Sequence, residues 1–396
     1  MSNPQPRRLA IVVSHPIQYY VPLYRRLARR DDLAIKVFYT WHAAEAPVRD
    51  RGFGEDVAWD IPLTEGYEFE RVHNRARDPG THHFGGLVNP SLVRKVADWQ
   101  PQFVHVTGWA WRSHAFALRS FRRRGMPTLF RGDSHLLDSP LAGPRWLAKR
   151  ILLGRVYTWP HAFLVVGKAN RAYYEALGVE TQRLHDCPHS IDVERFAGAH
   201  QELEAEARRW RQALAIRDRA RVLLFAGKFE PKKRPVELMR AVRALGDRDI
   251  VLVMVGGGEL DAEVRSIAAL DPAHFRVLPF QNQSRMPVVY RLGDAFVLPS
   301  AYGETWGLGV NEAIACGRPV LVSDRVGCAA DVVDRTCGRV FPWNESSAMI
   351  AAMKELIADR DRLSAMGAAA ARRAWSFDIG VTESALLRAL ECVGKG

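Results

Sequence analysis

Two glutamates, Glu304 and Glu312, flank a glycine-containing stretch whose residue types suit a phosphate group. Gly307 and Gly309 lie between them, after an apolar run at 295–298 and at the start of a helix-forming segment. Glycines leave backbone amides uncovered there, and the positive end of a helix dipole attracts an anion. Carboxylates on either side of a diphosphate can hydrogen-bond neutral hydroxyls. The stretch therefore predicts a diphosphate site with a sugar on one side and a ribose on the other. The alternative is an ordinary glycine-rich turn with two surface glutamates.

A basic segment follows the apolar run at 222–226. It reads Gly-Lys-Phe-Glu-Pro-Lys-Lys-Arg-Pro and contains Lys228 and Lys233. Two cations that face a diphosphate neutralise the charge that develops on a leaving group, and a transferase can then work without a metal ion. A basic surface turn is the alternative interpretation of this segment.

The elements that must position these residues follow an alternating pattern of strand and helix, which predicts an α/β fold. A chain of 396 residues is too long for one ordinary core, so we expect two domains. In such domains ligands bind at the carboxyl edge of the sheet, in the loops that follow the strands. Residues 41–90 are rich in Gly, Pro, His and acidic residues. We expect a long irregular insertion in the first domain, with a short strand near 69–72, that shapes an acceptor pocket.

Polar residues follow two of the expected strands in the first half. His15 and Gln18 come after the first apolar run, and Arg131, Asp133 and His135 come after the run at 127–130. At a carboxyl edge these side chains could bind sugar hydroxyls or an anionic acceptor. The alternatives are a structural His-Pro turn and a turn held by side-chain hydrogen bonds.

The stretch from Glu304 to Glu312, with the Ala-Cys-Gly-Arg-Pro-Val that ends it, resembles the signature of the retaining glycosyltransferases of family 4, also called glycosyl transferases group 1. The resemblance implies the GT-B fold, in which two Rossmann-like domains face each other across a cleft. It implies that Glu304 contacts the donor sugar and that Glu312 holds the nucleotide ribose. The amides that would hold the diphosphate are those of Gly307, Leu308, Gly309 and Val310.

The same resemblance assigns further positions. Lys228 and Lys233 match an arginine and a lysine that reach the donor diphosphate, and lysine at 228 keeps the charge but loses the bidentate fork. Gly256 and Gly257 would border the nucleotide pocket. Phe280 and Gln281 would lie where the base rests, which does not separate uracil from guanine.

In the first half the resemblance is looser. His135 or Asp133 matches a histidine that lies against the donor sugar. The loop that carries His15 and Gln18 lacks the Gly-Gly that many members have there, and we expect both residues near the donor. Arg131 is likewise expected to contact the donor.

The segment Pro-His-Ser-Ile-Asp at 188–192 resembles the one with which this family leaves its first domain. We therefore expect four parts. They are an acceptor-binding domain at 1–190, a linker at 191–199, a nucleotide-sugar-binding domain at 200–375, and a C-terminal helix at 376–396 that packs back on the first domain.

The activity implied is the transfer of a sugar, with retention, from a UDP- or GDP-sugar to an acceptor such as a glycan or a lipid-linked glycan intermediate. We expect no metal and no cofactor. The departing diphosphate would take the proton of the acceptor, with Lys228, Lys233, Glu304, Asp133 and His135 as the catalytic candidates. Two rival functions use the same donor half: a nucleotide-sugar epimerase or hydrolase, and a non-catalytic GT-B scaffold that binds a partner.

The net charge of +12 is concentrated in the first half, where residues 1–190 carry 27 Lys and Arg against 17 Asp and Glu. Basic residues recur there at near-helical spacing with apolar residues between them. Such stripes suit an anionic membrane surface or plain solvated helix faces. No nucleic-acid-binding motif accompanies the charge, so we expect no nucleic acid partner.

No apolar run approaches the ~20 residues that cross a bilayer. The first apolar run breaks at Ser14-His15-Pro16 and is interpreted as a strand rather than an export signal. The five cysteines form no Cys-x-x-Cys pair, which favours reduced thiols. A cytoplasmic location is expected, either free or on the inner face of the cell membrane.

Overall fold

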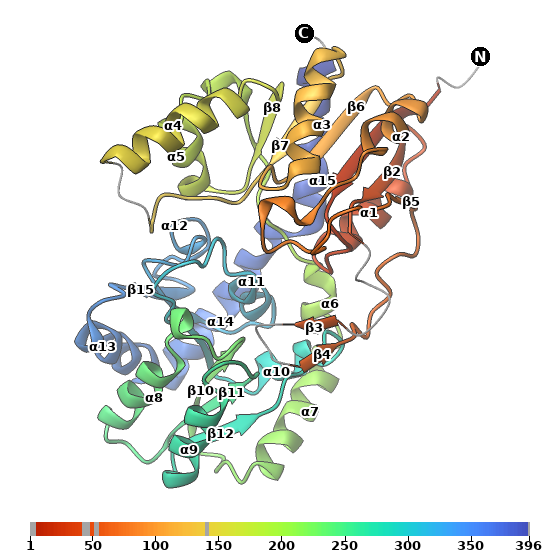
Figure 1. The fold of residues 1–396 in the computed structure, drawn as a ribbon. Coiled ribbons are helices and arrows are strands. Elements are labelled where there is room, and N and C mark those ends of the chain that lie inside the picture. The colour runs from red at the N-terminus through yellow and green to blue at the C-terminus, as the bar shows by residue number, and fades with distance from the viewer. Residues whose placement is uncertain (1–4, 42–47, 51–54, 139–141, 395–396) are drawn as a thin grey trace. The chain divides into compact units, whose positions relative to one another are not determined.

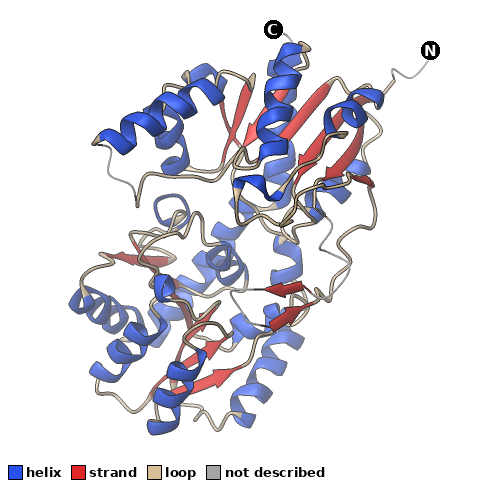
Figure 2. Ribbon diagram, in the orientation of Figure 1, coloured by secondary structure: helices blue, strands red, loops and turns tan. Residues whose placement is uncertain are grey.

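The structure is a computed structural model that describes residues 5–41, 48–50, 55–138 and 142–394. Figure 1 and Figure 2 show parallel sheets flanked by helices, and the chain divides into two compact units. The first unit comprises Met1–Pro47, Pro62–His189 and Ile379–Gly396, and the second comprises Val48–Ile61 and Ser190–Asp378. The expected α/β fold class is confirmed.

The first unit is built on a seven-stranded parallel sheet in the order β5-β2-β1-β6-β7-β8-β9. Its strands are β1 (Arg7–Val13), β2 (Leu33–Tyr39), β5 (Glu68–Arg71), β6 (Phe103–Thr107), β7 (Thr128–Arg131), β8 (Ala162–Val165) and β9 (Leu184–Asp186). Its helices are α1 (Val21–Ala28), η1 (Phe84–Gly86), α2 (Leu92–Asp98), α3 (Arg112–Arg123), α4 (Pro144–Val156), α5 (Lys168–Ala176), η2 (Thr181–Arg183) and α15 (Ile379–Gly394).

The central strand β1 is buried on both faces, as a parallel strand covered by helices must be. Leu9 and Ile11 lie in the core that α1 and α15 complete, whereas Ala10 and Val12 lie in the core on the other side, with α2, α3 and α5. In register, Ile11 pairs with Val37 of β2 and with His105 of β6. The sheet thus forms the middle of three layers.

The second unit contains a six-stranded parallel sheet in the order β12-β11-β10-β13-β14-β15. Its strands are β10 (Arg221–Ala226), β11 (Ile250–Val255), β12 (Phe275–Leu278), β13 (Ala295–Leu298), β14 (Val320–Ser323) and β15 (Gly338–Phe341). Its helices are α6 (Val193–Ala197), α7 (His200–Ala213), η3 (Pro231–Lys233), α8 (Pro235–Ala244), α9 (Asp261–Leu270), α10 (Met286–Arg291), α11 (Leu308–Ala315), α12 (Ala329–Val332), α13 (Ser346–Ile357), α14 (Arg360–Ala374) and η4 (Trp375–Phe377).

The last helix, α15, belongs to the first unit although it follows the whole of the second in sequence. Leu386 and Leu390 are buried in the same core as α1 and β1. The Glu383 carboxylate pairs with Arg26 of α1 and, at 3.3 Å, with Arg30, which follows that helix. The C-terminal helix that the GT-B resemblance implies is confirmed by these contacts.

The expected insertion at 41–90 differs from its prediction. A short antiparallel hairpin, β3 (Val48–Asp50) and β4 (Glu55–Val57), lies within it, and the segment Val48–Ile61 belongs to the second unit. The sequence of these strands has no alternation of apolar and polar residues, so period-two reasoning could not find them.

Among the helices that the structure describes, none is both long and apolar enough to cross a membrane. Cys187, Cys316, Cys328 and Cys337 are buried free thiols, and Cys392 is an exposed one.

Candidate functional site

The strand order of the second sheet places a switch point between β10 and β13. The chain leaves β10 towards β11 and β12 on one side, and returns to β13, β14 and β15 on the other. The loops after β10 and β13 therefore diverge at the carboxyl edge, which is where ligands bind in open α/β sheets. The basic segment and the glutamate-flanked stretch are these two loops.

The structure brings the two loops together through one ion pair. Lys233 Nζ lies 2.9 Å from Glu304 Oε2, and the Ser300 hydroxyl donates to the same oxygen at 3.2 Å. A Cβ on Gly227 would lie 3.7 Å from Lys233 Nζ, so the lysine side chain passes over a residue without a side chain. Lys228 is half-buried in the same loop. The arrangement holds an ammonium group at the switch point.

Backbone contacts fix this loop in place. The Ala301 amide donates to the Lys232 carbonyl at 2.8 Å, and the Phe229 amide donates to the Gly257 carbonyl at 2.8 Å. A Cβ on Gly256 would lie 2.0 Å from the Gly227 carbonyl oxygen, and Gly256 has a φ of +146°. Gly256 is therefore required for the close approach of two loops, whether or not it borders a nucleotide.

Helix α11 begins at this edge. Its N-cap, Gly307, has a φ of +94°, a left-handed conformation that favours glycine. The Gly327 amide donates to the Glu304 carbonyl at 3.0 Å, and this contact anchors the loop. The amides of the first turn of a helix have no acceptor within the helix, and Leu308 and Gly309 are in that turn. The Val310 amide is also expected to donate to a phosphate. In the structure it donates to the Gly307 carbonyl instead, at 2.8 Å.

Glu312 lies one turn further along α11 and is 2% exposed. Its Oε2 accepts a hydrogen bond of 2.6 Å from the Tyr290 hydroxyl of α10. A Cβ on Gly309 would lie 3.0 Å from that hydroxyl, so glycine leaves space for the tyrosine. Sequence reasoning missed Tyr290, since an aromatic residue in an apolar helix signals only a core position.

The expected base-binding loop follows β12. Phe280 and Gln281 are both half-buried there, and the Phe280 ring meets the Trp59 ring edge to face at 6.4 Å. The Asp60 carboxylate accepts from the Ser284 amide at 3.1 Å, and Asn282 Nδ2 donates to the Ala58 carbonyl at 2.6 Å. Residues 58–60 therefore complete this loop from a distant part of the sequence. No motif in the sequence signals them.

In the first unit the switch point lies between β1 and β6. His15 and Gln18 follow β1 and are half-buried. His15 Nδ1 lies 2.9 Å from the Ser14 hydroxyl, and its ring meets Trp41 edge to face at 5.2 Å. Burial lowers the pKa of His15 to about 4, so its ring is neutral at pH 7.

Arg131 is expected to contact the nucleotide-sugar donor, but the structure gives it a different set of contacts. Its guanidinium is buried and donates to the carbonyls of Cys187, at 2.9 Å, and of Pro188, at 3.3 Å. It also lies 3.4 Å from His189 Nδ1 and over the ring of Tyr20. The side chain therefore holds the segment 187–189 against β7 rather than reaching into solvent.

The other two candidates, Asp133 and His135, lie on the loop after β7 and differ in burial. Asp133 is exposed, whereas His135 is buried and its Nδ1 accepts from the Leu137 amide at 3.2 Å. Asn170 of α5 donates to the Ser134 carbonyl at 2.7 Å. The segment is thus an ordered turn, and the His135 ring and the Asn170 side chain supply these hydrogen bonds. The roles of Asp133 and His135 towards a donor stay a prediction.

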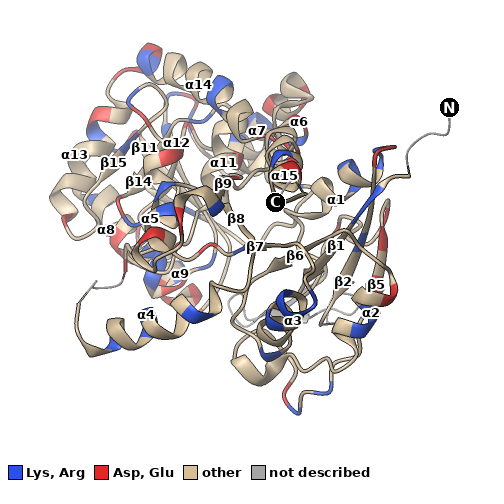
Figure 3. Cartoon of the chain, turned by 90° about the horizontal axis from the view of Figure 1, so that it is seen from above, with Lys and Arg blue, Asp and Glu red and all other residues tan. Residues whose placement is uncertain are grey.

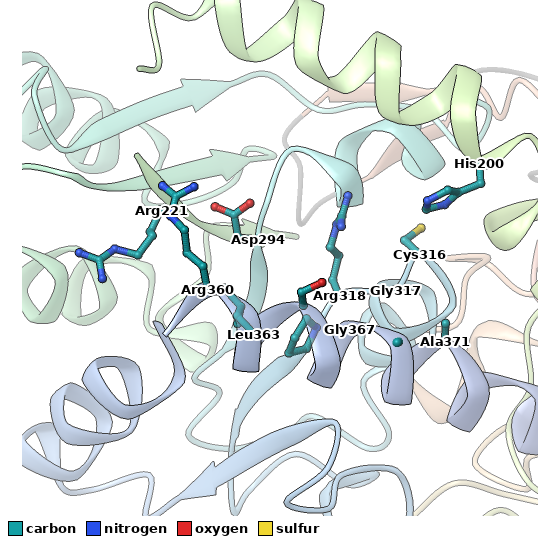
Figure 4. A pocket seen from close by; sticks show the side chains of 13 residues that line it. His200, Arg221, Asp294, Cys316, Gly317, Arg318, Arg360, Leu363, Gly367 and Ala371 are labelled. Carbon is teal, nitrogen blue, oxygen red and sulfur yellow. The ribbon is translucent and has the colours of Figure 1, made fainter. Parts of the chain in front are cut away.

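A cavity of about 450 Å³ lies elsewhere in the second unit. Arg221 and Asp294 are among the residues that line it (Figure 4). With Pro319 they mark the amino ends of β10, β13 and β14, whereas Lys233 follows the carboxyl end of β10. Arg221 is paired with Asp247 at 2.7 Å, and Arg318 is paired with Glu204. This cavity lies at the amino edge of the sheet, whereas open α/β sheets bind their ligands at the carboxyl edge, so it is not a rival diphosphate site.

The sequence profile described as Glycosyl transferases group 1 matches residues 206–373. A D-inositol 3-phosphate glycosyltransferase of Salinispora arenicola is 32% identical over 50% of this chain and 47% of its own length. A phosphatidyl-myo-inositol mannosyltransferase of Mycolicibacterium smegmatis is 28% identical over 57% of this chain and 55% of its own length. The chain spans about half the length of the curated relatives that it matches.

Solved structures resemble the whole chain in fold. The Anabaena HepE protein in complex with UDP has a TM-score of 0.72 at 15% identity, over 97% of this chain and 99% of its own. A glycosyltransferase from Rickettsia africae has a TM-score of 0.74 at 12% identity, over 99% of both chains. These likenesses confirm the GT-B fold. The profile confirms the resemblance that the stretch from Glu304 to Glu312 predicts, and residues 206–373 of this chain belong to the glycosyl transferases group 1 family.

Proposed function

We propose that this protein is a retaining glycosyltransferase that moves a sugar from a nucleotide-diphosphate sugar to an acceptor without a metal ion. The observation that carries the proposal is the 2.9 Å pair of Lys233 and Glu304 at the switch point of the second sheet, beside the first turn of α11. A cation, a carboxylate and a helix N-terminus in one place suit a diphosphate that carries a sugar.

The chemistry follows from charge. When the bond between the sugar and the diphosphate breaks, negative charge grows on the diphosphate. Lys228, Lys233 and the α11 amides of Leu308 and Gly309 stabilise that charge. Glu304 gives up its contact with Lys233 and accepts from the sugar hydroxyls, while Glu312 accepts from the ribose. Retention follows from attack by the acceptor on the face from which the diphosphate leaves, and the diphosphate takes the acceptor proton.

UDP and GDP are the proposed nucleotides. The solved structures of Anabaena HepE include complexes with UDP and with UDP-glucose, which supports uridine on the ground of shared fold. The names of the curated relatives specify inositol phosphate and phosphatidyl-inositol acceptors. An acceptor with a polyol or glycan hydroxyl next to a phosphate or lipid phosphate is therefore the class proposed here.

Helix α4 supports an anionic membrane surface as a further partner. Leu147, Ile151 and Leu152 are among the most exposed large apolar residues of the described chain, at 57%, 67% and 57%. Arg145 and Arg150 are exposed on the same helix, and basic residues also recur on α3 (Figure 3). Apolar side chains flanked by arginine suit the interface of an anionic leaflet. In and after α1, Arg26 and Arg30 are less available to a membrane, since both pair with Glu383.

A donor screen followed by a transfer assay tests the activity. UDP- and GDP-sugars are first ranked by the rise in melting temperature that they produce, since a ligand of the folded state stabilises it. The best donor is then incubated with and without extracts that contain polyol, glycan and lipid-phosphate acceptors, in the presence of EDTA. Transfer of the sugar with the anomeric configuration of the donor supports the proposal.

The same assay separates the two rivals. Release or isomerisation of the sugar when the donor is alone indicates a hydrolase or an epimerase. Donor binding with no transfer to any acceptor indicates a binding scaffold.

Vesicle flotation tests the membrane proposal on its own. The wild-type protein is expected to float with vesicles that contain anionic phospholipid and not with neutral ones, and Ile151→Ser combined with Leu152→Ser should abolish flotation. Equal flotation of the double variant contradicts the role of α4.

A further inference from the structure

One group of three potential metal ligands stands out among the described residues. Asp78, His82 and His83 each offer a ligand atom, and these atoms all lie within 4.8 Å of one another. All three side chains are exposed, on the loop between β5 and α2 of the first unit. The group lies outside the second unit, which holds the proposed donor site.

The distances suit a small cation. Asp78 Oδ2 lies 2.9 Å from His82 Nε2 and 3.5 Å from His83 Nε2. Four ligands at about 2.0–2.1 Å around a tetrahedral Zn²⁺ lie roughly 3.4 Å apart. The two observed separations bracket that value. Small side-chain rotations therefore convert the present hydrogen bond between Asp78 and His82 into a shared contact with an ion.

The donor set selects the type of ion. Two imidazoles and one carboxylate suit borderline cations such as Zn²⁺, Co²⁺, Ni²⁺ and Cu²⁺. Mg²⁺ and Ca²⁺ prefer six or more oxygen ligands, which this group does not supply. Three protein ligands leave at least one position for water.

The loop that carries the group is ordered at its base. Asn74 Nδ2 donates to the Gly86 carbonyl at 2.8 Å, and the Gly80 amide donates to the same carbonyl at 3.2 Å. The Trp111 indole donates to the Thr81 carbonyl at 3.1 Å. These bonds close the segment 80–86 into a compact loop, so the ligands do not have to be gathered from a disordered chain.

The histidine rings are positioned by the same loop. A Cβ on Gly80 would lie 2.6 Å from His82 Nδ1, so the His82 ring occupies space that only glycine leaves. His83 Nε2 lies 3.0 Å from the Asp78 carbonyl oxygen, and the two histidine rings meet at 4.7 Å. The same Nε2 is the potential ligand atom of His83, so a bound ion replaces the hydrogen bond between this nitrogen and the Asp78 carbonyl.

We propose that Asp78, His82 and His83 form a binding site for a borderline divalent cation, represented by Zn²⁺. A bound ion joins positions 78, 82 and 83 and stabilises the loop 78–86 in one conformation. The inference depends on contacts within the first unit and is independent of the proposed transfer reaction.

A competition titration with a chromophoric chelator tests the site. The full chain is used without a histidine tag and with Cys392→Ser, because the exposed Cys392 thiol is a competing ligand. We expect one Zn²⁺ to bind, and the affinity to fall about tenfold or more in His82→Ala and in His83→Ala. Gly80→Ala should also weaken binding, since it displaces the His82 ring and removes no ligand.

His200→Ala is the matched control, because His200 is an exposed histidine of the second unit. It should bind Zn²⁺ as tightly as the parent. Circular dichroism and the melting temperature establish that each variant is folded. Zn²⁺ binding with parental affinity in the variant that lacks both His82 and His83 overturns the proposal.

Two further measurements place the ion. Co²⁺ should give visible d–d bands without sulfur-to-metal charge-transfer bands, as nitrogen and oxygen ligands require. Amide hydrogen exchange of residues 78–86 should slow on addition of Zn²⁺ and stay unchanged with Mg²⁺. Slowing elsewhere with none in this loop contradicts the assignment.

Discussion

At the scale of single residues, the proposed donor would have to rearrange the pair of Lys233 and Glu304. Both side chains are mostly buried, at 20% and 15% exposure, so their attraction is less screened than at an open surface. A diphosphate brings more negative charge to Lys233 than one carboxylate does. The ion pair therefore holds the lysine in place, and in the proposed reaction a donor replaces Glu304 as its partner.

Replacing Lys233 tests this interpretation. Lys233→Ala should lower kcat for transfer by about 100-fold or more, because it removes a cation that acts on the leaving group. The matched control is Lys232→Ala, since Lys232 lies in the same turn but pairs with Glu230 at 3.0 Å. Steady-state kinetics of both variants give the comparison, and equal loss in both would show that only the fold of the turn is involved.

Replacing Glu304 and replacing Glu312 should have different effects on the binding of the nucleotide-sugar and of the bare nucleoside diphosphate. Glu304→Ala should weaken binding of the nucleotide-sugar about tenfold and leave binding of the bare nucleoside diphosphate undiminished, since only the former has a sugar. Glu312→Gln should weaken the binding of both ligands about tenfold. Both contain the ribose, and a carboxylate accepts a stronger hydrogen bond from a ribose hydroxyl than an amide oxygen does. Calorimetric titration of the two ligands measures the four affinities. An identical pattern in the two variants contradicts the assigned positions.

At the scale of the element, helix α11 is bounded by two left-handed glycines. Gly307, at its start, has a φ of +94°, and Gly317, beyond its end, has a φ of +69°. Val326 Cγ1 lies 2.8 Å from where a Cβ on Gly307 would be, whereas a Cβ on Gly317 would have its nearest neighbour at 3.7 Å. The two ends are alike in backbone conformation and differ in what surrounds them.

This difference gives a matched pair of substitutions. Gly317→Ala should lower the free energy of unfolding by about 1–2 kcal/mol, because alanine is disfavoured at positive φ. Gly307→Ala should lower it further, because its Cβ would also press on Val326. Only Gly307→Ala should also raise the KM for the donor, since it displaces the first turn of α11. Urea unfolding and donor kinetics measure the two effects. A normal KM in Gly307→Ala argues against a diphosphate at this helix.

At the scale of the whole molecule, the first unit contains several buried histidines. Burial lowers the pKa of His105 to about 3 and that of His114 to about 4. It also lowers the pKa of His15 to about 4 and that of His189 well below its usual value. Burial acts in this direction because it disfavours the charged imidazolium. All four residues belong to the first unit.

The first unit should therefore be sensitive to acid. In the unfolded chain these histidines bind protons near pH 6.5. In the folded chain His15 and His114, whose pKa values are about 4, stay neutral down to about that pH, and the lowered pKa values of His105 and His189 act in the same direction. Stability is thus fully present above pH 6.5 and is lost as the pH falls, by about 1.4 kcal/mol per pH unit for each proton. Hydrogen exchange of the first-unit strands as a function of pH measures this loss.

His105→Leu is the control for the dependence of stability on pH. His105 is buried, and leucine removes its ionisable group. Between pH 6.5 and 4, the free energy of unfolding of the variant should fall less steeply than that of the wild type. The two slopes should differ by about 1.4 kcal/mol per pH unit, the contribution of one proton. A slope unchanged from the wild type would show that His105 is already protonated in the folded protein.

The sequence by itself determined the alternation of strands and helices, the two loops at the switch point of the second sheet, and the resemblance to glycosyl transferases group 1 that the profile match at residues 206–373 confirms. Those features depend on local periodicity and on residues close together in the chain, such as Gly307 and Glu312. The tertiary structure decided which distant residues meet. Tyr290 reaches Glu312, residues 58–60 reach the loop after β12, and Arg131 is buried against Cys187 and Pro188. No local pattern encodes such contacts, because they arise only when separate elements pack and satisfy one another's buried polar groups.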